Sequence, residues 1–298
     1  MTFQKWRYSS TTDKIFDIIV FAVLSVLLIV VLYPLYFVVI ASFSDANAVN
    51  RGEVLLWVKG FNLDAYTTVF KDSRILTGYG NTIFYTIGGT LLSVFITVCA
   101  AFPLSRKNLA FHGFWTWFFL ITMYFGGGLI PTYLQVQRLH LTNTVWAVMI
   151  VGCLSVYNLI ICRTFFTTNI PDELWEAASI DGCTMYKFFY RIVIPNAKAI
   201  IAIMVLYYAV AMWNDYMRAL IYLNDVSQYP LQMVLRDLLL STQGMEQNLD
   251  PALLDKAAQR GQALKYAAII FSSVPVLAIY PFVQKHFVKG VMIGAVKG

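Results

Sequence analysis

The stretch Ile18–Phe43, IIVFAVLSVLLIVVLYPLYFVVIASF, contains no charged residue. A helix needs about 20 mainly apolar residues to cross the hydrocarbon core of a bilayer, so this stretch is long enough for one crossing. It is also too long for the apolar region of a signal peptide, and no convincing cleavage site accompanies it. We therefore predict a retained spanning helix near residues 15–40.

Five further apolar stretches predict five more spanning helices. Four of them carry no charge, at 75–105, 108–137, 139–162 and 266–284. The fifth, 199–214, is shorter and stays apolar through Leu223 apart from Asp215 and Arg218. Allowing for turns, we predict an all-α integral membrane protein with one transmembrane domain (1–298) and helices near 15–40, 79–102, 112–131, 143–163, 199–220 and 263–283.

Composition supports a membrane protein and excludes several other classes. Of the 298 residues, 59% are hydrophobic and 13% are charged, whereas soluble domains carry about 25% charged residues. The net charge of +6 is dispersed along the chain, which favours contact with an anionic membrane surface over nucleic acid binding. The four cysteines form no C-x-x-C pair and the three histidines lie far apart. We expect no disulfide and no metal site.

Charges in the short loops predict the orientation. An even number of spans puts both termini on one side, and the short loop 103–111 carries Arg106 and Lys107. The short loop 132–142 carries only Arg138, and the long loops 41–78 and 221–262 count for little under the positive-inside rule. The terminal tails add further cations, namely Lys5, Arg7, Lys285, Lys289 and Lys297. We therefore assign both termini and loop 103–111 to the cytoplasm.

This orientation leaves one unusually long cytoplasmic connection, 164–198. Asn169 or Asp172 can cap a helix there, and Pro171 suits its first turn. The spacing predicts an apolar face of Leu174, Ala177 and Ala178, with Ile180 beside it. Gly182 can adopt the left-handed cap conformation, and a second stripe follows, ending at Pro195: Met185, Phe188, Phe189, Ile192 and Val193. Helix, tight turn and helix are predicted, and by moment alone they could rest on the lipid interface.

The string Glu176-Ala177-Ala178-x-x-Asp181-Gly182, followed by Phe188 and Ile194-Pro195, resembles the EAA loop of ABC importer permeases. In that family the loop is a coupling helix that docks on a cytoplasmic ATPase subunit. The resemblance therefore implies that the ATPase-coupling residues are Glu176, Ala177, Ala178, Asp181, Gly182 and Pro195. The chain departs from the family in having Cys183 where a smaller residue is usual, and in lacking a second proline soon after Pro195.

The resemblance extends over nearly the whole chain. Similar motifs are Tyr33-Pro34, Pro103–Arg106, Gly126–Pro131, Trp213-Asn214 and the tail 284–298. They look like the carbohydrate-uptake branch, most of all the oligosaccharide permeases of firmicutes and the alginate-type importers. This implies half of a permease heterodimer in the bacterial cytoplasmic membrane, importing an oligosaccharide by alternating access. The implied partners are a second permease, two ATPase subunits that bind ATP and Mg, and an extracellular sugar-binding (lipo)protein.

Absent motifs point the same way. No Gly-Lys pair occurs, so the chain has no phosphate-binding loop G-x-x-x-x-G-K-[ST] and we expect it to bind no cofactor itself. It also lacks G-x-S-x-G and H-E-x-x-H, and we expect no catalytic residue and no enzyme activity. The alternative is a secondary transporter coupled to ions or protons. That would need a midplane carboxylate or broken helices in two repeats, and neither a midplane carboxylate nor a clear repeat is evident.

Several residues are candidates for a substrate cavity. Asp215 and Arg218 can pair at i, i+3, either as a structural pair at the outer mouth or in a cavity. Trp213 and Asn214 suit a sugar, although tryptophan is also common as an interfacial anchor. Gly126–Gly128 favour close helix packing, with an unwound turn lining a cavity as second choice. The full set of cavity candidates is Tyr124, Gly127, Tyr157, Asn158, Trp213, Asn214 and Asp215.

Two further segments are predicted to contact partners. The outer loop 221–262 is long, with apparent helical pieces at 231–240 and 251–259, and we expect it to contact the sugar-binding protein. The tail 284–298 has Gly290, Gly294 and Gly298 at intervals of four. The resemblance places it between the ATPase subunits, and the alternative is a basic tail on anionic lipid.

Overall fold

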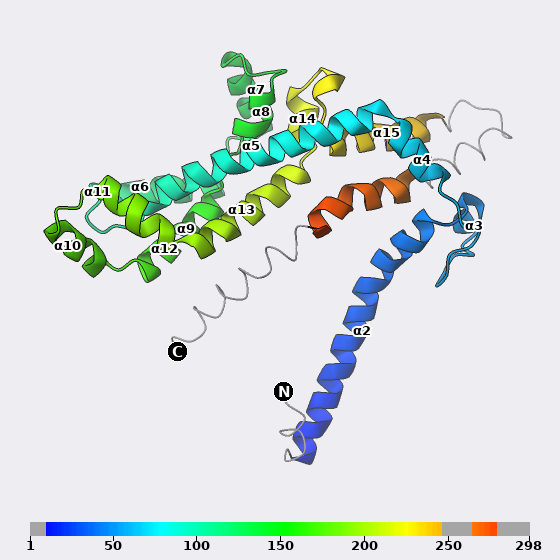
Figure 1. Cartoon of the computed structure of the whole chain (residues 1–298), viewed down its shortest axis with the longest axis horizontal. Coiled ribbons are helices and arrows are strands. Elements are labelled where there is room, and N and C mark those ends of the chain that lie inside the picture. Colours follow the sequence, from blue (N-terminus) through cyan, green and yellow to red (C-terminus); the bar gives the residue numbers. More distant parts are fainter. Residues whose placement is uncertain (1–9, 246–263, 279–298) are drawn as a thin grey trace. The chain divides into compact units, whose positions relative to one another are not determined.

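Helices make up the regular structure of the residues described in this computed structural model, 10–245 and 264–278 (Figure 1). The chain divides into two units. One contains Met1–Lys71 and Leu239–Phe271, and the other contains Asp72–Leu238 and Ser272–Gly298. The all-helical prediction is confirmed for the described residues.

The first unit is dominated by α2 (Thr11–Ser42), which has 32 residues. Ser10 caps it, because its hydroxyl accepts the Asp13 N–H at 3.2 Å and the Asp13 carboxylate accepts the Ser10 N–H in return. The apolar side chains of α2 are exposed along most of its length, as expected of a helix that faces lipid. Two short helices follow, α3 (Ala46–Asn50) and α4 (Asp64–Lys71). The helix predicted near 15–40 is confirmed.

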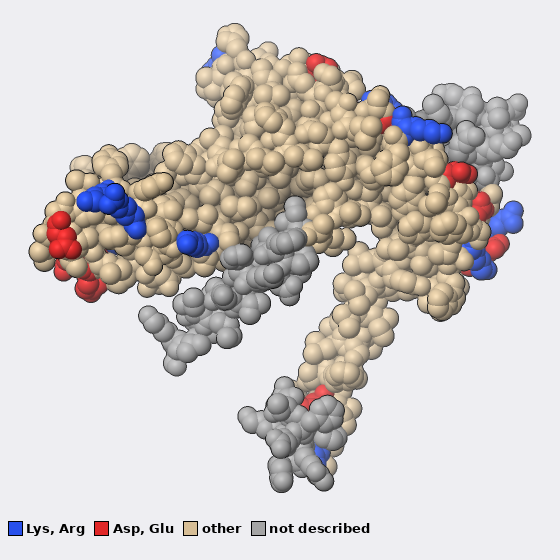
Figure 2. Space-filling view, in the orientation of Figure 1, with Lys and Arg blue, Asp and Glu red and all other residues tan. Residues whose placement is uncertain are grey.

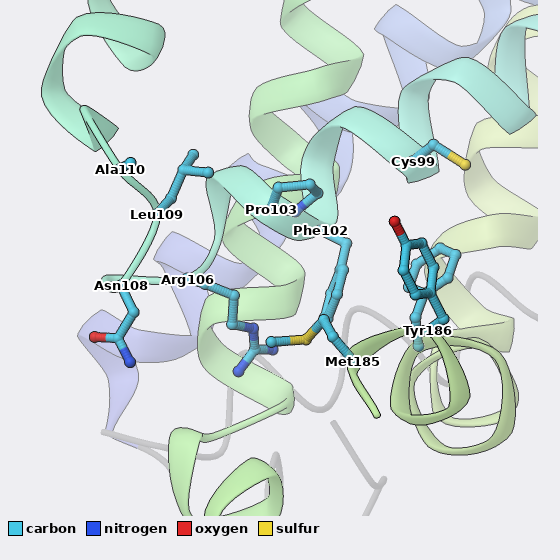
Figure 3. Close-up of a pocket in the computed structure, with 10 residues that line it drawn as sticks. Cys99, Phe102, Pro103, Arg106, Asn108, Leu109, Ala110, Met185 and Tyr186 are labelled. Atoms are coloured by element: carbon cyan, nitrogen blue, oxygen red, sulfur yellow. The ribbon is translucent and has the colours of Figure 1, made fainter. Parts of the chain in front are cut away.

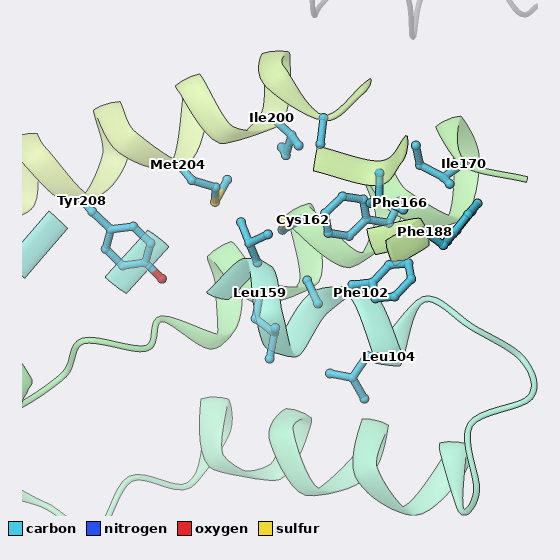
Figure 4. Packing of buried hydrophobic residues seen from close by; sticks show 14 of the residues in the cluster. Phe102, Leu104, Leu159, Cys162, Phe166, Ile170, Phe188, Ile200, Met204 and Tyr208 are labelled. Carbon is cyan, nitrogen blue, oxygen red and sulfur yellow. The ribbon is translucent and has the colours of Figure 1, made fainter. Parts of the chain in front are cut away.

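The second unit is built around α5 (Ser73–Leu104), which confirms the helix predicted near 79–102. Asp72 caps α5, and its hydrogen bond to the Arg74 guanidinium lowers the pKa of the Asp72 carboxyl. Helices α9 (Val156–Asn169) and α13 (Lys198–Trp213) pack along α5 (Figure 1). Their shared core is aromatic at one end and aliphatic in the middle (Figure 4), with Phe102, Phe166, Phe188, Leu159, Ile200 and Met204.

Three of the predicted spans differ from the single helices expected. The span 112–131 is α6 (His112–Tyr124) and α7 (Leu129–Arg138), which meet at 113°. The span 143–163 is α8 (Val145–Ile150) and α9, separated by residues 151–155. The span 199–220 is α13 and α14 (Met217–Tyr222), separated by residues 214–216.

The breaks have local causes that a search for charge-free stretches does not detect. Gly128 has φ +86° and Gly152 has φ +73°, conformations that residues with a Cβ rarely adopt. At the third break, the Asp215 carboxylate accepts the N–H groups of Met217 and Arg218 at 3.1 and 3.4 Å and so starts a new helix.

The number of spans therefore stays a prediction. Among the described residues, α2 and α5 are long and apolar enough to cross a bilayer, and the count reaches four if each sharply bent helix pair forms one span. The second bent pair, Met185–Asn196 with Lys198–Trp213, meets at 77°. The helix Leu264–Ala278 lies within the span predicted at 263–283, whose end is outside the described residues.

The remaining elements form the two predicted loops. The cytoplasmic connection contains α10 (Asp172–Ile180), α11 (Met185–Phe188), the π-helical turn η1 (Phe189–Val193) and α12 (Ile194–Asn196). The outer loop contains the 3-10 turn η2 (Val226–Gln228) and α15 (Leu231–Met245), which confirms the helix predicted at 231–240. The piece predicted at 251–259 and the tail 284–298 lie outside the described residues.

The start of α15 lies directly on α5, and a glycine permits this approach. The Leu231 N–H donates to Thr82 Oγ1 at 2.8 Å, and Asn81 Nδ2 donates to the Ser227 carbonyl at 2.7 Å. A Cβ at Gly78 would lie 3.1 Å from Val234 Cγ2 and 3.2 Å from the Leu231 backbone. Gly80, two residues along the same helix, has no such neighbour within 4 Å.

We expect Gly78→Ala to lower the melting temperature of the purified protein relative to Gly80→Ala. Both changes gain about 1 kcal/mol of helix propensity, so the difference isolates overpacking against Leu231, which typically costs about 1–3 kcal/mol. Thermal unfolding in detergent measures it. Equal melting temperatures would show that α15 does not rest on α5 at this point.

Candidate functional site

The cytoplasmic segment contains a helix with a well-defined end. At the end of α10 the Gly182 N–H donates to the Ser179 carbonyl at 3.0 Å, and the Cys183 N–H donates to the Ala178 carbonyl at 2.9 Å. Together with φ +71° at Gly182, these bonds form a Schellman motif. The predicted left-handed cap at Gly182 is confirmed.

The buried face of α10 differs from the prediction. Ala178 is buried and Trp175 is half-buried, with its ring 5.3 Å from that of Phe188. Leu174 and Ala177, predicted to share this face with Ala178, are exposed. Trp175 and Ala178 share a face at i, i+3, and the large indole covers the core where Leu174 was expected.

The second stripe is largely as predicted. Phe188 and Val193 are buried, Phe189 and Ile192 are half-buried, and Met185 is exposed. Phe188 and Phe189 are adjacent in sequence, yet their ring centroids lie 6.3 and 4.9 Å from that of Phe102. The segment after Gly182 is therefore fixed to the end of α5.

The opposite face of α10 is open. Of the six residues predicted to couple to an ATPase, all but Ala178 are exposed: Glu176, Ala177, Asp181, Gly182 and Pro195. Ile180 is 86% exposed beside them. Figure 2 shows acidic side chains gathered over α10, where Asp172, Glu173, Glu176 and Asp181 lie. The segment thus offers an acidic, partly apolar surface on a rigid support.

An ion pair joins this segment to loop 103–111. Arg106 Nη1 donates to Asp172 Oδ1 at 3.0 Å, and the Arg106 side chain is only 9% exposed. Its guanidinium carbon lies 5.1 Å from the centroid of the Phe102 ring. Since the pair is formed, loops 103–111 and 164–198 lie at the same end of α5, as the charge distribution predicted. Arg106 was noted as a cation in a short loop, but its partner lies 66 residues away and was not foreseen.

Arg106 also lines an apolar cavity of about 540 Å³ between loop 103–111 and α11 (Figure 3). The other lining residues are Cys99, Phe102, Pro103, Asn108, Leu109, Ala110, Met185, Tyr186 and Phe189. None of the seven predicted substrate-cavity residues lies here. No group of three His, Cys, Asp or Glu side chains that could hold a metal ion is found within 10–245 and 264–278.

At the other end of α13, Asp215 and Arg218 form the predicted ion pair. Arg218 Nη1 also donates to the carbonyls of Val148 and Val151, both at 2.9 Å. These two carbonyls are at the end of α8, so Arg218 joins α14 to the break between α8 and α9. The contacts favour a structural role for the pair.

The two residues before the pair have different environments. Trp213 is buried, its indole N–H donates to the Ser272 carbonyl at 3.0 Å, and its ring packs edge-on against Tyr79 at 5.8 Å. Asn214 is exposed, and its amide donates to the Val210 carbonyl at 2.9 Å. Both the polar edge and the ring of Trp213 are therefore occupied by other groups of the protein.

Other cavity candidates are separated by the helix breaks. No atom lies within 4 Å of a Cβ built at Gly126 or Gly127, so the close packing favoured from the sequence is absent within the described chain. With φ +86° at Gly128, the unwound turn is what the structure shows. Tyr124 beside it is 74% exposed. In α9, Tyr157 is 62% exposed while Asn158 is buried. The roles of these residues in substrate binding stay predictions.

Comparison with known proteins gives consistent relatives. No family model matches the chain. Protein LplC of Bacillus subtilis is 36% identical over 98% of this chain and 98% of its own length. The polygalacturonan/rhamnogalacturonan transport system permease protein YtcP of the same organism is also 36% identical, over 96% of this chain and 99% of its own.

A solved structure agrees with these relatives. It is a bacterial ABC transporter involved in the import of the acidic polysaccharide alginate, of which one chain matches this one with a TM-score of 0.84 and 29% identity. The match covers 94% of this chain and 99% of that one.

We expect Arg218→Ala to destabilise the protein more than Asp215→Asn. The arginine change leaves two carbonyls and a carboxylate without their partner, and each buried polar group left unpaired costs about 1–3 kcal/mol. The asparagine introduced by the second change keeps an oxygen that can accept the Met217 N–H. Thermal unfolding in detergent, with Arg138→Ala on the exposed face of α7 as control, measures the order. If both variants melted at the same temperature, the carbonyl contacts would not matter.

Proposed function

Because the chain belongs to the family of ABC transporter permeases for carbohydrate uptake, we propose that it is one of two transmembrane subunits of an ATP-driven, binding-protein-dependent oligosaccharide importer. In this proposal it crosses the bacterial cytoplasmic membrane six times, with both termini inside. Two separate ATPase subunits bind ATP and Mg, and an extracellular sugar-binding protein delivers the substrate.

The observation that carries the proposal is the construction of α10. Its exposed face presents Glu176, Asp181 and Ile180, while Trp175 and Ala178 on the other face pack into the core. A protein subunit that binds the exposed face can move the buried face only together with its neighbours. A helix lying on lipid would instead turn its apolar side to the membrane.

Movement of α10 would reach the spanning helices through one cluster of side chains. The cluster contains Ala178 and Phe188 of the cytoplasmic segment, Phe102 of α5, Phe166 of α9 and Met204 of α13. Protein interiors are close-packed and have low compressibility, so displacement of one member shifts the others. Docking at α10 can therefore change the positions of three long helices.

In the alternating-access mechanism that we propose, the ATP-bound ATPase pair draws the two coupling segments together. The cavity between the permeases then opens to the outside. A ligand shifts a conformational equilibrium only by its differential affinity for the two states, so ATP and the loaded binding protein must favour the same one. The Arg106–Asp172 pair and the Phe188 contacts keep α10 attached during this change.

An ion-coupled secondary transporter receives less support. Helix breaks occur at 125–128, 151–155 and 214–216, as such a transporter can have. However, the carboxylate at the third break, Asp215, is paired with Arg218 and caps α14. Family membership and the exposed coupling segment both favour the ABC importer.

The substrate class follows from the relatives. YtcP is named for polygalacturonan and rhamnogalacturonan, and the matching structure is described as an importer of alginate. We propose that this chain likewise handles an oligosaccharide derived from a carbohydrate polymer.

We expect Gly182→Val to abolish most of the stimulation of ATP hydrolysis by loaded binding protein, and Gly182→Asn to retain it. A Cβ at Gly182 meets no atom within 4 Å, so the only obstacle is the left-handed backbone conformation. That conformation costs a β-branched residue about 1–2 kcal/mol but is tolerated by asparagine. Hydrolysis by the reconstituted complex, with and without binding protein and sugar, is the measurement.

Gly113→Val is the matched control, because Gly113 also has open space around it and its φ is not in the left-handed region. This variant should behave like the native protein. Normal stimulation in Gly182→Val would remove the turn from the coupling mechanism.

A further inference from the structure

The segment between α3 and α4 forms a closed loop with a charged neck and an apolar tip. At the neck, Lys59 Nζ lies 3.8 Å from Glu53 Oε2, and the Asp45 N–H donates to the Lys59 carbonyl at 2.9 Å. Val54 is buried and fixes the base. The tip is the run Leu55, Leu56, Trp57 and Val58, which contains no polar side chain.

The tip is exposed. Trp57 is 79% exposed, Leu55 61% and Leu56 59%. Three large apolar side chains side by side in water would be an unusual surface, and such patches mark contacts with a partner or a membrane. The position of the loop along α2 decides between these.

Two tyrosines hold the loop against α2. Tyr33 Oη donates to the Leu55 carbonyl at 3.2 Å, and Tyr36 Oη donates to the Leu56 carbonyl. The chain therefore leaves α2 at Ser42, passes through α3 and returns beside the last turns of the helix (Figure 1). The tip lies at the level of residues 33–36 and not beyond the end of α2.

That level corresponds to the edge of the hydrocarbon core. Asp17 is the last charged residue of α2, and about 20 residues beyond it are needed to cross the core. Counting from Asp17 reaches Phe37, so Tyr33 and Tyr36 lie within about one helical turn of the boundary. Tilting of α2 would place them deeper.

We propose that loop 53–59 is a membrane anchor whose tip, Leu55 to Trp57, enters the leaflet at the C-terminal end of α2, the outer leaflet in the proposed topology. Tryptophan favours this interfacial depth. The tyrosine hydroxyls satisfy two carbonyls that water cannot reach there. The neck charges, Glu53 and Lys59, stay at the level of the headgroups. The inference rests on the membrane placement of α2 in the proposed function.

The test is the accessibility of a spin label at position 57. Trp57→Cys is made in a chain whose native cysteines, Cys99, Cys153, Cys162 and Cys183, are replaced by alanine. The complex is reconstituted into phosphatidylethanolamine–phosphatidylglycerol liposomes. Leu27→Cys in the middle of α2 is the lipid reference, and Arg51→Cys in the turn before the loop is the water reference.

We expect oxygen to relax the label at position 57 several-fold more strongly than a water-soluble nickel chelate does, as at position 27 and opposite to position 51. Strong relaxation by nickel would place the tip in water and overturn the inference. Weak relaxation by both reagents would place it under another protein and also overturn it. A label at position 27 that behaved as in water would contradict the placement of α2, and with it both proposals.

Tryptophan quenching provides a second test that keeps the native cysteines. The native chain and Trp57→Phe are compared in liposomes whose lipids carry bromines at carbons 6 and 7 or at carbons 11 and 12. We expect the fluorescence lost in Trp57→Phe to be quenched more by the shallower bromines. A component that neither lipid quenches would overturn the inference.

Discussion

A backbone in hydrocarbon has no water to satisfy its N–H and C=O groups, and this constraint explains where the helices of this protein can break. At the end of α8, the carbonyls of Val148 and Val151 are taken by Arg218. At the start of α9, the Ser155 N–H donates to Tyr208 Oη at 3.1 Å, and that hydroxyl also contacts Thr97 Oγ1 at 2.7 Å. Each of these interruptions is supported by a side chain from another helix.

The same constraint distinguishes the two ends of the second unit. Near the cytoplasmic segment the helices are joined by aromatic packing around Phe102, Phe166 and Phe188. Near α14 they are joined by Arg218 and by the hydroxyls of α5, including Thr82, which accepts the Leu231 N–H. Aromatic packing tolerates small sliding movements, whereas a half-buried arginine with three partners does not. The proposed mechanism assigns movement to the first end.

How much of this could be predicted from the sequence depends on the distance over which each signal acts. Apolar stretches and the cap at Gly182 are local, and the helices around 15–40 and 79–102 and the turn at Gly182 were predicted correctly. The helix breaks were missed because hydropathy averages over Gly128, Gly152 and Asp215. Trp175 was missed because its burial depends on Phe188, and the link from Arg106 to Asp172 spans 66 residues. The tyrosine contacts to Leu55 and Leu56 lie 20 or more residues apart and carry no sequence signal.

The π-helical turn η1 (Phe189–Val193) has a consequence for how the length of the chain is constrained. A π turn accommodates an extra residue compared with an α turn, which is how neighbouring Phe188 and Phe189 both reach Phe102. An α-helix advances about 100° per residue. Deleting one residue from this turn would therefore rotate α10 by about that angle relative to α13, and Glu176 and Asp181 would face a different direction. The spacing between Gly182 and Lys198 is thus a structural determinant in its own right, and insertions or deletions there should be less tolerated than changes of side chain.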